Sequence, residues 1–174
     1  MKAVRTALIL MTLNAAALAQ SGSKPGADER YFNLVDAVQS PQDLSAAELA
    51  VLATDDLMRK HFNAAGSTLT QEGLEAAAVP LCNSGERDLI VIGHGGSYAT
   101  EYAGPFWILR DLPSGPVVVL SETSLSISLD TKRSNKCLNV ESFAVTATDG
   151  ITTQYKFDGQ KYAQSKQTSV KLPQ

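Results

Sequence analysis

The segment Gly93-His94-Gly95-Gly96-Ser97 places an imidazole, glycine amides and a hydroxyl within five residues. Glycine amides that follow a strand can stabilise a developing alkoxide, and a Ser next to a His base can act as a nucleophile. The chain lacks the GxSxG turn that usually carries a nucleophilic Ser, and its other histidine, His61, lies in a different region. The pattern therefore favours a glycine-rich strand exit, with a secreted hydrolase (an esterase or a hydrolase of wall components) that uses His94 to Ser97 as the alternative.

The other histidine, cysteine and aspartate residues do not have the spacing that metal binding or catalysis requires. Two scattered histidines and two cysteines form neither an HExxH nor a CxxC pattern, so we expect no metal site and no cofactor. Asp55-Asp56 is typical of a helix start, where carboxylates meet the positive end of the helix dipole. Asp111, Asp149 and Asp158 are typical of turns. The sequence thus predicts no catalytic residue.

The segment from Gly95 to Gly104 combines small residues with Tyr98, Glu101 and Tyr102. Tyrosines in a glycine-containing loop between two apolar strands supply contact area at low entropic cost. We therefore predict that Tyr98, Glu101 and Tyr102 bind a partner. In the alternative interpretation, the two tyrosines only cover a core formed by Phe106 and Trp107.

Cys82 and Cys137 are the only cysteines in the chain. An even number of cysteines in an exported chain is typical of disulfide bonding. The sequence therefore predicts one disulfide between Cys82 and Cys137.

The N-terminus has the pattern of a secretory signal peptide. Lys2 and Arg5 precede a short apolar run, and Ala17-Leu18-Ala19 matches a small-x-small cleavage site. We expect residues 1–19 to be removed and residues 20–30, which are polar and contain Gly and Pro, to form a flexible leader. The expected location is the periplasm or the exterior of the cell, with no integral membrane segment after processing.

Composition and charge exclude several other classes of protein. The chain has 174 residues, 44% of them hydrophobic, and a net charge of −3. These values fit one globular domain, which we place at residues 31–165. An acidic chain without a basic block is a poor candidate for binding nucleic acid.

Residues 31–80 are predicted to form a helical layer. Ser45 and Glu48 have the spacing of a capping box at a helix start. A single long helix would divide the apolar residues between two faces, so we expect a break near Thr54. The segment 71–78, which ends before Pro80, is predicted as a third short helix.

Residues 81–165 are predicted to form an antiparallel β domain, followed by a C-terminal tail at 166–174. Three segments are short apolar runs, and three alternate apolar with polar residues, as strands with one buried face do. The six segments are 88–93, 105–110, 116–121, 124–130, 143–147 and 151–157. Asp149-Gly150 and Asp158-Gly159 are hairpin-turn signals. The predicted fold class is α+β, with short N-terminal helices packed on a six-stranded, mainly antiparallel meander.

Two further motifs support a resemblance. The run Gly104-Pro105-Phe106-Trp107 before a hydrophobic strand, together with the closing sequence from Tyr155 to Tyr162 (YKFDGQKY), resembles a loose group of exported bacterial proteins. The resemblance spans residues 88–162 and implies no defined activity. Some members carry a calcium-loop-like segment before the first strand, where this chain has Ser84-Gly85-Glu86-Arg87 instead.

Taken together, these patterns favour an exported, non-enzymatic binding module, with an inhibitor-like role as one form of it. Its expected partner is a protein or glycan in the cell envelope or outside the cell.

Overall fold

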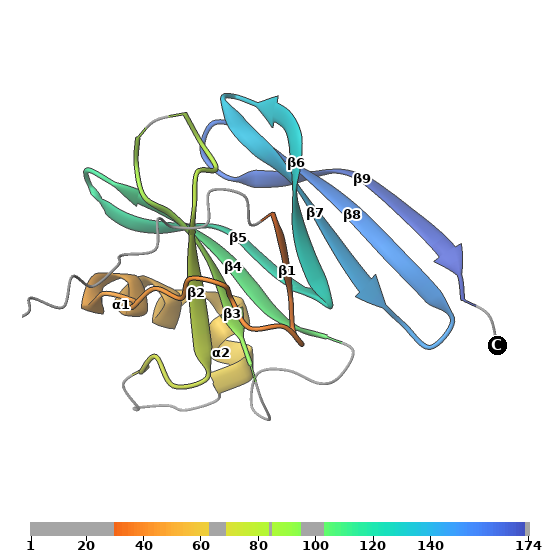
Figure 1. Ribbon diagram of the computed structural model, residues 1–174, viewed down its shortest axis with the longest axis horizontal. Helices are drawn as coiled ribbons and strands as arrows, with labels where there is room; N and C mark the ends of the chain where they lie inside the picture. Colours follow the sequence, from red (N-terminus) through yellow and green to blue (C-terminus); the bar gives the residue numbers. More distant parts are fainter. Residues whose placement is uncertain (1–29, 63–68, 84, 95–102, 173–174) are drawn as a thin grey trace, which may run out of the picture.

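The computed structural model describes residues 30–62, 69–83, 85–94 and 103–172, and these residues form two antiparallel sheets and two short helices (Figure 1). One sheet has four strands in the order β2-β3-β4-β5, which are Leu74–Val79, Asp88–Gly93, Gly104–Leu112 and Gly115–Ser124. The other has five strands in the order β1-β6-β7-β8-β9, which are Tyr31–Asn33, Ser126–Ser134, Cys137–Val145, Asp149–Phe157 and Tyr162–Lys171. Helices α1 (Ala46–Thr54) and α2 (Asp56–Phe62) lie beside the four-stranded sheet.

The predicted six-stranded meander is wrong, because the strands divide into two sheets. The chain leaves the four-stranded sheet at Ser124 and enters the five-stranded sheet at Ser126, with Leu125 between them. The Leu125 amide donates to the Phe143 carbonyl at 2.7 Å, which fixes this crossing. All six predicted strand segments lie in or overlap strands β3 to β8, but the mainly β architecture replaces the expected α+β class.

The third predicted helix is also wrong. Its residues form β2, which pairs with β3 from Leu74 opposite Gly93 to Val79 opposite Asp88. The run Leu-Glu-Ala-Ala-Ala-Val has high helix propensity, but its small side chains also fit a strand that is buried on both faces. Tertiary pairing therefore overrides the local preference.

The four-stranded sheet separates two hydrophobic clusters. In β3, Ile90 and Ile92 face the five-stranded sheet, whereas Leu89 and Val91 face the helices. In β4, Trp107 belongs to the cluster on the helix side. The alternation of strand side chains thus fills both layers. This burial on both faces explains why the segments 88–93 and 105–110 are apolar without interruption.

The helices begin and end as their sequence predicts. Ser45 Oγ accepts a hydrogen bond from the Glu48 amide at 3.3 Å, and Glu48 Oε2 accepts one from the Ser45 amide at 2.6 Å, so the capping box is confirmed. Helix α1 ends at Thr54 and α2 begins at Asp56, which confirms the break. Asp55 Oδ1 caps α2 by accepting from the amides of Leu57 and Met58.

The disulfide between Cys82 and Cys137 is confirmed, and it joins the two sheets. Cys82 precedes β3 of the four-stranded sheet, and Cys137 begins β7 of the five-stranded sheet, with their Cα atoms 4.0 Å apart. The Leu138 amide donates to the Leu81 carbonyl at 2.8 Å beside the bond. The covalent link therefore reinforces a short backbone bridge.

A buried charged cluster lies near the disulfide. Asp88 is fully buried; its carboxylate accepts from the Cys82 amide and from Arg110 Nε, both at 3.0 Å. The Arg110 guanidinium also pairs with Glu86 and lies 5.3 Å from the centre of the Phe157 ring in β8. Burial raises the pKa of the Asp88 carboxyl above its usual value. Arg110 thus contacts both sheets and compensates the buried carboxylate.

Candidate functional site

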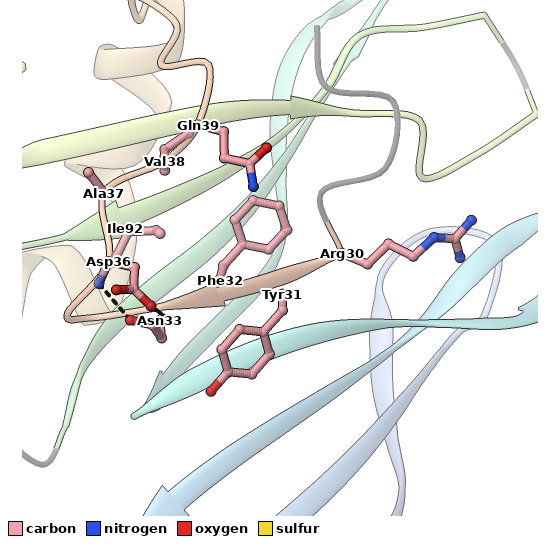
Figure 2. A pocket seen from close by; sticks show the side chains of 9 residues that line it. All are labelled: Arg30, Tyr31, Phe32, Asn33, Asp36, Ala37, Val38, Gln39 and Ile92. Carbon is pink, nitrogen blue, oxygen red and sulfur yellow. Dashed lines mark hydrogen bonds between the residues drawn. The ribbon is translucent and has the colours of Figure 1, made fainter.

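A cleft of about 390 Å³ lies where β1 and the segment after it meet the end of β3 (Figure 2). Its lining combines two aromatic residues, aliphatic residues, amides and one charge of each sign. The lining residues are Arg30, Tyr31, Phe32, Asn33, Asp36, Ala37, Val38, Gln39 and Ile92.

Asn33 shapes the cleft by turning the chain at the end of β1. Its Oδ1 accepts hydrogen bonds from the amides of Val35 and Asp36, at 2.7 and 2.8 Å, and its Nδ2 donates to Asp36 Oδ2. An Asn side chain that bonds the backbone two and three residues on replaces the bonds of a regular turn. The turn sends the chain toward the four-stranded sheet, where the Val38 amide donates to Glu75 Oε2 at 3.0 Å.

The cleft has a buried apolar floor and a polar rim. Phe32, Val38 and Ile92 are buried in the core between the sheets. Figure 2 shows Phe32 and Tyr31 on opposite sides of β1, as expected for neighbours in a strand. Tyr31 is 58% exposed, and its ring lies on the side of β1 away from the buried Phe32. Apolar walls with a few polar groups are typical of ligand sites.

His94 lies next to a carboxylate close to this cleft. Its Nε2 is 3.5 Å from Glu75 Oε2, the same oxygen that accepts from Val38. The His94 amide donates to the Gly73 carbonyl, which holds the end of β3 against the residue before β2. The structure thus brings the imidazole and an acid together, whereas Ser97 lies outside the described residues.

The three predicted binding residues, Tyr98, Glu101 and Tyr102, also lie outside the described residues. Phe106 and Trp107 are fully buried, as expected if these two residues form part of the core.

The acidic residues occupy structural positions. Asp55 caps a helix, and Asp158 Oδ1 accepts from the amides of Gln160 and Lys161 in a turn, which lowers the pKa of its carboxyl. The Asp149 carboxylate accepts hydrogen bonds from the hydroxyls of Thr148 and Ser169 and pairs with Lys171. These contacts lower the pKa of the Asp149 carboxyl. Asp111 is the last residue but one of β4, where it lies opposite Pro116, so it precedes the turn that the sequence predicts for it. In the described ranges, no three His, Cys, Asp or Glu side chains are grouped closely enough to hold a metal ion.

The sequence reasoning missed two residues on the five-stranded sheet. The alternation in the segment 143–147 predicts that Phe143 points into the core, yet it is 36% exposed and lies on the opposite face. The sequence predicts a helical layer that includes Tyr31, yet Tyr31 lies in the edge strand β1. No local signal separates Phe143 from a core residue, because it follows the apolar alternation of a strand with one buried face.

No helix in the described part of the chain has the length and apolar character that a membrane crossing requires. No protein-family model matches the chain, and neither a curated protein nor a solved structure matches it. The resemblance to the loose group of exported proteins therefore stays a prediction.

Proposed function

We propose that this chain is an exported, non-enzymatic binding module that recognises a protein or glycan of the cell envelope. The observation that carries the proposal is the cleft beside β1, with its buried floor of Phe32, Val38 and Ile92. Arg30 and Asp36 add one charge of each sign at the rim, so the cleft can orient a polar ligand as well as hold an apolar group.

Export is part of the proposal. The N-terminal pattern predicts cleavage after Ala19, and a disulfide is typical of oxidising compartments. N-terminal sequencing of the protein recovered from the periplasm or the medium tests this part, with Gln20 as the expected first residue. Recovery of the uncleaved chain in the cytoplasm would contradict it.

The binding test uses the processed chain, residues 20–174, in two arms. One arm titrates a panel of envelope and wall glycans; the other identifies proteins retained from an envelope extract and titrates each one purified. Arg30→Ala should weaken the binding of a ligand in the cleft, by about thirtyfold if Arg30 contributes about 2 kcal/mol. Lys161→Ala, in the turn before β9 at the opposite edge of the five-stranded sheet from β1, is the matched control. Absence of saturable binding in both arms would overturn the proposal.

The predicted contribution of Tyr98 and Tyr102 needs a second measurement. The segment that contains them follows His94 in the sequence, and His94 is two residues after Ile92, which lines the cleft. If they bind the partner, Tyr98→Ala and Tyr102→Ala weaken affinity and leave the thermal midpoint nearly unchanged. Trp107→Ala, which truncates a fully buried residue, should cost about 3–5 kcal/mol of stability. A similar loss of stability in all three variants, at constant affinity, would assign the tyrosines to the core.

A secreted hydrolase is the second candidate, and the contact between His94 and Glu75 favours it. A carboxylate next to an imidazole can orient the ring, as a general base requires. Ester and glycan substrates should then be turned over by the native chain and not by His94→Ala or Ser97→Ala. Turnover that both variants abolish would replace the binding proposal with this one.

A further inference from the structure

The five-stranded sheet has an outer face, defined here as the face turned away from the four-stranded sheet. Phe32 and Ile127 are opposite each other and buried between the sheets, so the neighbouring pair Tyr31 and Ser128 points outward. In β7, Leu138 and Val140 are buried in the same core. Asn139, Glu141 and Phe143 alternate with these residues and therefore lie on the outer face.

The ring of Phe143 is held in place on this face by a glycine. A Cβ atom built on Gly150 would lie 3.0 Å from Phe143 Cε2, so the ring lies directly over the Gly150 backbone. A side chain at position 150 would require the ring to shift by a few tenths of an ångström. Phe143 is therefore an aromatic surface that is prepositioned before a ligand binds, which reduces the entropic cost of binding.

Asn139 provides a second and independent sign of a ligand. It is only 9% exposed, and among the described residues its Oδ1 has no hydrogen-bond partner. It lines a hollow of about 20 Å³ together with Glu141, Gln154 and Lys156. Such a volume accommodates about one water or hydroxyl group. A buried acceptor without a donor is costly, and a ligand hydroxyl would remove that cost.

The charges and polar groups on the outer face favour a neutral, hydroxyl-rich ligand. The hollow is lined by two acids, Asp130 and Glu141, and by Lys156, and Lys166 lies opposite Gln154. The two signs balance, so the face does not select a charged polymer. The apolar side chains are separated by Ser, Thr and Gln, unlike the continuous apolar core of a protein–protein interface.

We infer that the outer face binds an extended, neutral polysaccharide along β7. Phe143 stacks against the C–H face of one sugar ring, and Asn139 accepts a hydroxyl roughly 14 Å further along the strand, at about 3.4 Å per residue. Tyr31, two strands away in β1, flanks the same chain. This inference rests on the proposed function for its class of ligand, a glycan, and goes beyond it by placing that ligand on the outer face and not in the cleft.

The test titrates soluble hexasaccharides of β-1,4-linked glucose and of N-acetylglucosamine into the processed chain by calorimetry. Insoluble cellulose and chitin are used in parallel sedimentation assays. Phe143→Ala should weaken binding by about thirtyfold, the loss expected for a main anchor. Phe143→Tyr retains the ring and should bind nearly as the native chain does. Gly150→Ala requires the ring to shift by a few tenths of an ångström, and should weaken binding less than Phe143→Ala does.

Matched variants separate this inference from the proposed function. Val35→Ala removes an exposed apolar side chain outside the outer face and should leave binding unchanged. If a neutral glycan binds but only Arg30→Ala weakens it, the site is the cleft, and the inference is wrong while the proposed function stands. Binding to a protein alone, or to an anionic polysaccharide alone, also overturns the inference. If neither a glycan nor a protein binds, the inference and the proposed function are both wrong.

Discussion

The hydroxyl of Tyr155 donates a hydrogen bond to Glu122 Oε2 at 2.5 Å, and this bond connects β8 of one sheet to β5 of the other. Burial raises the pKa of the Glu122 carboxyl above its usual value of 4.5. Burial and the adjacent carboxylate also raise the pKa of Tyr155, so its hydroxyl stays a donor at neutral pH.

We expect this pair to make stability fall as pH rises. Between the unfolded pKa of Glu122 and its higher folded pKa, the folded chain holds more protons than the unfolded chain. The stabilisation is therefore full at low pH and decreases as pH rises above about 4.5. Glu122→Gln keeps a neutral acceptor for Tyr155 and should flatten the dependence of the thermal midpoint on pH above about pH 4.5. Glu72→Gln changes an exposed residue and should keep the pH dependence of the native chain's thermal midpoint. Equal pH dependence in the native chain and in both variants would contradict the assignment of this effect to Glu122.

Asp55 should be far more important for stability than its neighbour Asp56. Besides capping α2, the Asp55 carboxylate accepts from Trp107 Nε1 at 2.9 Å and from Ser121 Oγ at 2.6 Å. Asp55→Ala removes the cap and leaves a buried indole N–H unpaired, which should cost about 3 kcal/mol in urea unfolding. Asp56→Ala removes only an exposed pair with Arg59 and should cost under about 0.5 kcal/mol. Similar losses for the two variants would show that the contacts with Trp107 and Ser121 contribute little.

Arg110→Met should destabilise the chain by about 3–5 kcal/mol, because it leaves the fully buried Asp88 without its guanidinium partner. The control is Arg59→Met, whose ion pair is exposed and whose loss should be small. Combining Arg110→Met with Asp88→Asn removes the unpaired charge and should recover part of the loss. A double variant less stable than Arg110→Met would contradict this explanation.

The disulfide closes a loop with a sequence separation of 55. In the chain-entropy model a loop of this length stabilises the fold by about 4 kcal/mol. The double variant Cys82→Ala, Cys137→Ala should therefore unfold at a lower urea concentration. A reducing agent should shift the native midpoint in the same direction and leave the double variant unchanged. Coincident midpoints for the oxidised native chain and the double variant would contradict the prediction.

Strands were predictable where one face is buried or where both faces are continuously apolar. Ile127 and Leu129 alternate with polar residues, and the run from Leu89 to Ile92 is buried on both sides, so both signals were present. The strand β9 was not predicted, because nine of its ten residues are exposed and polarity does not alternate along it. The division into two sheets occurs at Leu125, where no Gly, Pro or Asn marks a change of direction.

The candidate sites were less predictable than the strands. The cleft depends on Asn33, which turns the chain after β1, and on Glu75, which is distant in sequence and accepts from the Val38 amide at the end of that turn. The residues of the outer face can be predicted only if it is known which of the two alternating sets in each strand points inward. Phe143 follows the apolar pattern of a core residue, yet it lies on the outer face. Periodicity identifies the two sets of residues in a strand; only the position of the second sheet decides which set is buried.

The position of β9 at the edge of the five-stranded sheet affects how copies of this chain behave at high concentration. An edge strand presents unpaired amides and carbonyls that a second edge can extend, which is the first step toward fibrils. Lys161 precedes β9, and Lys166 and Lys171 lie within it, so positive charges recur along this edge. Two such edges repel each other at low ionic strength, and salt screens that repulsion. The spacing of three lysines is thus a built-in protection against self-association that weakens as ionic strength rises.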